Sequence, residues 1–110
     1  MVTTSTQANP TNFSRSVLEA GGWPTTLSNI VFLNSWQAAE GQWGATGRAY
    51  AGSSNNPLNI KATTPGQPSW SAPGSNGQLA GPFAIYPSLS SGAAATASLI
   101  RMSIPSSFNL

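Results

Sequence analysis

Apolar residues recur at helical spacing near the start of the chain, in the stretch TNFSRSVLEAGGWP. Its apolar face holds Phe13, Val17 and Ala20. Asn12 is suited to be the N-cap of this helix, and Gly21-Gly22 is suited to end it before a proline. The pattern predicts a helix of about ten residues.

A second helical pattern occupies PTTLSNIVFLNSWQAAEG, which opens with Thr and Ser as capping candidates and is expected to end at Gly41. Its predicted apolar face holds Leu27, Ile30, Val31, Leu33, Asn34 and Ala38. A second stripe with the same spacing holds Leu33, Trp36, Gln37 and Glu40. This places Glu40 at the C-terminal end of the helix, one turn beyond Trp36.

A third helix is predicted in SLSSGAAATASLIRMS, with Ser88 as N-cap and an apolar face of small and aliphatic residues. That face holds Leu89, Ala93, Ala97 and Ile100. Between the second and third helices, PLNIKA and GPFAIYPS are typical of strands and are separated by a segment rich in Pro and Gly. We expect a two-stranded hairpin with a long excursion.

The predicted organisation is a flexible tail over residues 1–10 and one small domain over residues 11–110. Its class is α+β but mainly α, with three or more helices and a short hairpin. The segment after the second helix, GQWGATGRAYAGSSNN, is rich in small residues and carries Trp43 and Tyr50. Aromatic residues in such a loop favour a binding surface over a plain connector.

The amino-acid composition argues against several classes of partner and reaction for this chain. Charged residues are only 5% of the chain, so four basic residues cannot build a dense electropositive face and nucleic acid is a poor partner. No apolar run approaches the roughly 18 residues of a membrane span. The chain has no His and no Cys, which removes most metal sites and excludes Ser-His-Asp and Cys-His catalysis.

Carboxylates are even scarcer than bases, because the chain has no Asp and its two acids are Glu19 and Glu40. The negative end of a helix dipole and the flanking Trp36 and Trp43 would both favour the protonated form of Glu40. A protonated acid in an aromatic-lined groove is what cleavage of a glycosidic bond needs. Alternatively, Glu40 is a solvated residue at a helix end and Trp36 is part of the core.

Three stretches in fixed order, FLNSWQAAEG, NNPLNI and FAIYPSLSSGAAATASL, resemble the lysozyme-like domains of bacteriophage tail and lysis proteins. The match covers about residues 13–103, and NNPLNIK is also similar to a turn of bacterial glucosaminidases. The resemblance implies a lysozyme-like fold, with Glu40 as general acid and Asn56, Asn59 and Tyr86 along a glycan groove. A single acid is similar to lytic transglycosylases and goose-type lysozymes, and no cofactor is implied.

The favoured interpretation is thus a virion-associated enzyme that cuts peptidoglycan glycan strands at the bacterial cell wall. Trp43, Tyr50, Asn56, Asn59 and Tyr86 would bind the substrate. The resemblance leaves open whether hydrolysis or intramolecular transfer follows, and which glycosidic bond is cut.

Two other interpretations stay open. Relatives commonly continue with a further helical segment where SSFNL ends this chain, so either the chain is a fragment or a partner subunit completes the core. Low charge and this ending also suit a non-catalytic structural component of a phage particle, in contact with other virion proteins. A weaker alternative is a glycan-binding module that uses Trp43, Tyr50 and Trp70.

Overall fold

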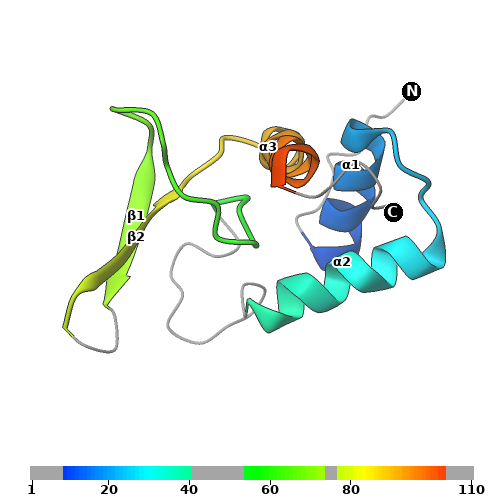
Figure 1. Cartoon of the computed structure of the whole chain (residues 1–110), viewed down its shortest axis with the longest axis horizontal. Coiled ribbons are helices and arrows are strands. Elements are labelled where there is room, and N and C mark those ends of the chain that lie inside the picture. The colour runs from blue at the N-terminus through cyan, green and yellow to red at the C-terminus, as the bar shows by residue number, and fades with distance from the viewer. Residues whose placement is uncertain (1–8, 41–53, 74–76, 104–110) are drawn as a thin grey trace, which may run out of the picture.

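The computed structural model describes residues 9–40, 54–73 and 77–103 of the chain. Its elements follow in the order α1 (Pro10–Gly21), α2 (Leu27–Ala39), β1 (Ser69–Pro73), β2 (Leu79–Ala84) and α3 (Leu89–Ser103). Helices hold 51% of the described residues, and the two strands form one antiparallel sheet, so the prediction of a mainly helical α+β fold is confirmed. Figure 1 shows the sheet standing to one side of the helices.

Helix α1 begins three residues earlier than the predicted cap would place it. Its N-cap is Asn9, whose side-chain oxygen accepts the backbone N–H of Asn12 at 2.9 Å. Pro10 is therefore the first helical residue and not the end of a tail, which suits proline because the first N–H of a helix has no intrahelical partner. The predicted glycine stop is confirmed, since Gly22 caps the helix in the left-handed conformation with φ 74°.

Helix α2 buries a different face from the one predicted. Thr26 caps its start and accepts the N–H of Asn29 at 3.3 Å. The side chains buried along α2 are Leu33 and Gln37, both on the second stripe, whereas Leu27 and Val31 are 78% and 52% exposed. The predicted face was wrong because apolar residues surround most of this helix, so spacing alone does not select one side. α2 ends at Ala39 with Glu40 as its C-cap, one residue before the cap predicted at Gly41.

A buried polar contact selects the face of α2 that meets α1. The Gln37 amide donates to the Ser14 hydroxyl at 2.7 Å and to the Pro10 carbonyl oxygen at 3.2 Å. Ser14 and Gln37 are both almost completely buried. Because a buried amide without partners is costly, this pairing fixes the rotation of α2 about its axis.

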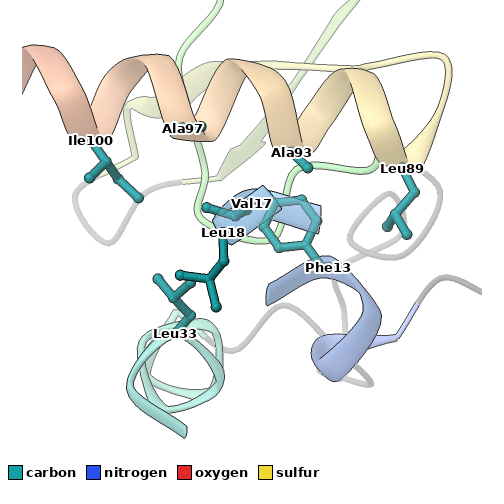
Figure 2. Packing of buried hydrophobic residues seen from close by; sticks show 8 residues of the cluster. All are labelled: Phe13, Val17, Leu18, Leu33, Leu89, Ala93, Ala97 and Ile100. Atoms are coloured by element: carbon teal, nitrogen blue, oxygen red, sulfur yellow. The ribbon is translucent and has the colours of Figure 1, made fainter. Parts of the chain in front are cut away.

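The apolar core lies between the three helices, as Figure 2 shows. α1 is the central helix, since it packs against both α2 and α3. The predicted apolar face of α3 is confirmed in full, and its two alanines allow close packing on α1. The buried cluster consists of Phe13, Val17, Leu18, Leu33, Leu89, Ala93, Ala97 and Ile100. No helix in the described parts of the chain is long and apolar enough to cross a membrane.

The hairpin contains one of the two predicted strands in part, since β2 overlaps GPFAIYPS at residues 81–84, whereas PLNIKA is replaced by β1. β1 lies inside the segment that its Pro and Gly content marked as an excursion, and Trp70 pairs across the sheet with Phe83. The centroids of the Trp70 and Phe83 rings are 5.1 Å apart. This aromatic cross-strand pair outweighs the turn-forming residues around it.

The stretch 57–62 is not a strand, although it runs along β2. It makes one isolated bridge, between Lys61 and Phe83, and Ala62 N–H donates to the Pro82 carbonyl oxygen at 2.9 Å. Ala84 N–H donates in turn to the Ile60 carbonyl oxygen at 2.9 Å. This stretch therefore joins the sheet to the helical part of the molecule.

Candidate functional site

Glu40 occupies the end of α2, as the sequence predicts. It is the C-cap residue, and its backbone N–H donates to the Trp36 carbonyl oxygen at 3.1 Å. The Glu40 side chain is half-buried. Trp36 is partly buried against the core and contacts the Phe32 ring at 6.3 Å between centroids, so the expectation that it belongs to the core is met.

The NNPLNI stretch folds as a turn that brings Asn59 to Glu40. Asn59 N–H donates to the Asn56 carbonyl oxygen at 3.3 Å, with Pro57 as the first central residue of the turn, where its fixed φ is favoured. Asn59 itself has φ 57°, a left-handed conformation that Asn tolerates better than most residues. Its Nδ2 donates to Glu40 Oε2 at 3.5 Å. Two motifs that lie 19 residues apart in the sequence thus meet in space.

At 3.5 Å that contact is longer than the roughly 2.7–3.2 Å of most N–H···O hydrogen bonds. Hydrogen bonds of catalytic groups are often long in unliganded enzymes and shorten when substrate is bound. The geometry therefore fits a carboxyl group whose orientation an amide controls.

Asn56 has a different environment from the groove position expected for it. Its side chain is 2% exposed, and its Nδ2 donates to the carbonyl oxygens of Ile60 and Ala84, both at 2.9 Å. Its Oδ1 accepts the Ile60 N–H at 2.9 Å. The amide holds the turn against the end of β2, so burial and bonding favour support of the site over contact with a substrate.

Tyr86 follows β2 and joins the same junction through its backbone. Its N–H donates to the Ser54 carbonyl oxygen at 2.8 Å, and its own carbonyl oxygen accepts Asn55 Nδ2 at 2.9 Å. Burial raises the pKa of the Tyr86 phenol above its ordinary value. The phenol is therefore a neutral hydroxyl group at neutral pH, available as a hydrogen-bond donor.

Of the three loop aromatic residues considered for binding sugar rings, the structure describes one, Trp70. Trp43 and Tyr50 lie outside the described residues, and their substrate-binding role stays a prediction. Trp70 is half-buried and packs on Phe83 within the sheet, an arrangement typical of a structural cross-strand pair.

The reactions that this site could catalyse are limited by its small number of carboxylate and metal-ligating side chains. Glu19, the only other carboxylate of the chain, is exposed on α1. Within the described residues, no group of three or more His, Cys, Asp or Glu side chains could hold a metal ion. The site can supply one carboxyl group and an amide that contacts it.

Two supporting residues were not singled out from the sequence. Asn55 has φ 53° and clamps Tyr86, and Ser54 is buried at the same junction. The paired asparagines before a proline are the signal that could have identified this turn, because Asn is the commonest non-glycine residue with positive φ.

Comparison of the chain with protein-family models, with curated proteins and with solved structures found no match in any of the three. The assignment of function therefore depends on the chemistry of the site itself.

Proposed function

We propose that this chain is a peptidoglycan-cleaving domain of a phage particle, in which Glu40 is the general acid. The single observation that carries the proposal is the contact between Glu40 and Asn59. Two of the sequence motifs that suggested the activity belong to separate segments, and their contact, with a carboxyl group and an amide 3.5 Å apart, supports the proposal.

In the proposed reaction, the Glu40 carboxyl group transfers its proton to the glycosidic oxygen as the bond from that oxygen to the sugar carbon breaks. The electron pair of the broken bond stays on the leaving oxygen, and the sugar carbon takes on oxocarbenium character. A second carboxylate is not needed if a hydroxyl group of the sugar, or water, attacks that carbon. Glu40 then takes back a proton from the attacking oxygen.

We also propose that the three helices and the hairpin are a small lysozyme-like arrangement, with the glycan strand between the end of α2 and the junction of residues 54–60. The half-buried position of Glu40 supports this, because a general acid has to be reachable by substrate and partly shielded from water. The place of action would be the bacterial cell wall, reached as part of a virion.

A zymogram on purified bacterial cell wall tests the proposal. Wild-type protein should clear the wall, and Glu40→Gln, which keeps the shape of the side chain, should lose about 10²–10⁴-fold in rate. Glu19→Gln is the matched control, since it removes the only other carboxylate and should clear like the wild type. Equal clearing by Glu40→Gln and wild type would exclude the assignment.

A second candidate is a structural component of the particle without turnover. It is favoured by the outer surface of α2, where Leu27, Val31 and Phe32 are 78%, 52% and 44% exposed on a helix without a charged residue. Apolar surface of this kind commonly marks a protein interface. If the isolated protein sediments as a soluble monomer and cuts glycan strands, this candidate is excluded.

A further inference from the structure

Asn59 combines an uncommon backbone conformation with an uncommon side-chain environment. Its backbone is left-handed, with φ 57°. Its Oδ1 atom is buried and, among the described residues, has no hydrogen-bond partner. Strained backbones and unsatisfied buried polar atoms are concentrated at functional sites.

The surroundings hold Asn59 in this conformation. The Asn56 side-chain amide accepts the backbone N–H of Ile60 and donates to the Ile60 carbonyl oxygen. It also donates to the carbonyl oxygen of Ala84, at the end of β2. The backbone on either side of Asn59 is therefore fixed by a buried amide, and the direction of its side chain is fixed with it. That direction brings Nδ2 to Glu40 Oε2.

We propose that Asn59 is a positioning residue for Glu40, and that it does not bind the glycan itself. The inference rests on the proposed function of Glu40 as general acid. Because Oδ1 is covered, a sugar cannot reach it in this structure, whereas Nδ2 contacts the carboxyl group directly. The amide limits rotation of the carboxyl group and so keeps the proton directed toward the bond that is cut.

An amide also suits both protonation states of the acid. In the observed orientation, Nδ2 donates to a carboxylate oxygen. If the amide plane turns over, Oδ1 takes the place of Nδ2 and accepts the hydroxyl hydrogen of the protonated acid. Asn59 can thus bond to Glu40 before and after proton transfer.

The chain provides a matched pair of variants. Asn59→Gly removes the amide and keeps the left-handed backbone, which glycine adopts without strain. Asn55→Gly makes the same exchange at φ 53°, four residues earlier, where the amide bonds to Tyr86 and not to Glu40. Circular dichroism and thermal melting of both variants establish that each is folded under the assay conditions.

On soluble glycan strands, we expect Asn59→Gly to lower kcat about 10- to 100-fold with KM within about twofold of the control, because a positioning residue acts on the chemical step. Asn55→Gly, which removes an amide from the same junction without touching Glu40, should lower kcat less than Asn59→Gly does. A raised KM with unchanged kcat in Asn59→Gly would show direct binding of substrate and would overturn the inference.

A spectroscopic measurement tests the same contact without relying on activity. With only two glutamates in the chain, ¹³C labelling of glutamate Cδ gives two side-chain carboxyl signals. At fixed pH, Asn59→Gly should move the Glu40 signal and leave that of Glu19 in place, and Asn55→Gly should move neither. An unmoved Glu40 signal overturns the inference. If Glu40→Gln clears cell wall like wild type, the proposed function fails, and this signal still decides whether the amide contacts the acid.

Discussion

The carbonyl oxygen of Asn55 lies against the α-carbon of Gly92, so closely that a Cβ atom added to Gly92 would overlap it. Gly92 is in the first turn of α3, and Asn55 opens the junction that carries Asn59. The absence of a side chain at Gly92 therefore sets how closely the site approaches the helical core.

Gly92→Ala should destabilise the protein by about 1–3 kcal/mol, because the backbone of Asn55 has to move to admit the methyl group. In a free helix the same change would stabilise by about 1 kcal/mol, so the sign of the effect is diagnostic. Urea denaturation measures it. Ser98→Ala, on the exposed side of the same helix, should change the free energy of unfolding by less than about 0.5 kcal/mol. Stabilisation by Gly92→Ala would contradict the close approach.

Asn56→Ala should cost about 2–4 kcal/mol, because it removes three hydrogen bonds, which involve the Ile60 N–H and the carbonyl oxygens of Ile60 and Ala84. Hydrogen exchange should show faster exchange at the Ile60 amide than in the wild type. Asn29→Ala is the comparison, since its amide makes a single surface bond, to the Pro24 carbonyl oxygen, and its loss should cost under about 1 kcal/mol. Equal effects of the two changes would argue against a supporting role for Asn56.

Ser14 and Gln37 should be energetically coupled across the interface of α1 and α2. Gln37→Met keeps the length of the side chain and removes the donor to Ser14, at a cost of about 1–3 kcal/mol. Adding Ser14→Ala should then cost less than Ser14→Ala does alone, because the hydroxyl has already lost that partner. A double-mutant cycle in urea measures the difference, and strict additivity would mean that the bond contributes nothing.

Stability should fall at alkaline pH through Tyr86. Because burial raises the pKa of its phenol above 10.0, the folded state holds this proton more tightly than the unfolded state does. The contribution of Tyr86 to stability is complete below pH 10.0 and is lost as the pH rises from there through the raised pKa. Tyr86→Phe should flatten the decline of the unfolding free energy above about pH 10. Parallel curves for Tyr86→Phe and wild type would refute this.

Much of the helical part could be predicted from the sequence. The apolar face of α3 and the glycine stop of α1 follow from local rules, since small residues at helical spacing and a glycine pair leave few alternatives. The face of α2 could not be predicted in this way. Its rotation depends on Gln37 finding Ser14 on another helix, which is a tertiary contact with no local signal.

The hairpin and the candidate site also combine features that local sequence rules predict with features that depend on tertiary contacts. The position of Glu40 at a helix end follows from helical spacing, whereas the contact with Asn59 depends on how a turn 19 residues away is held. The position of β1 was missed because Pro and Gly around Trp70 obscured a strand that its pairing with Phe83 stabilises. Asn56 was expected to face substrate because an asparagine looks the same in a sequence whether it supports a turn or lines a groove.

The caps of α1 and α2 and the bonds of Gln37 and Asn56 are made by hydroxyl and amide groups. Asn9 and Thr26 cap their helices, Gln37 joins α2 to α1, and Asn56 joins the turn to β2. Dissolved ions screen charges that are exposed to water, and these bonds present no net charge to screen. We therefore expect the loss of stability caused by Asn56→Ala to be the same in dilute buffer and at physiological ionic strength.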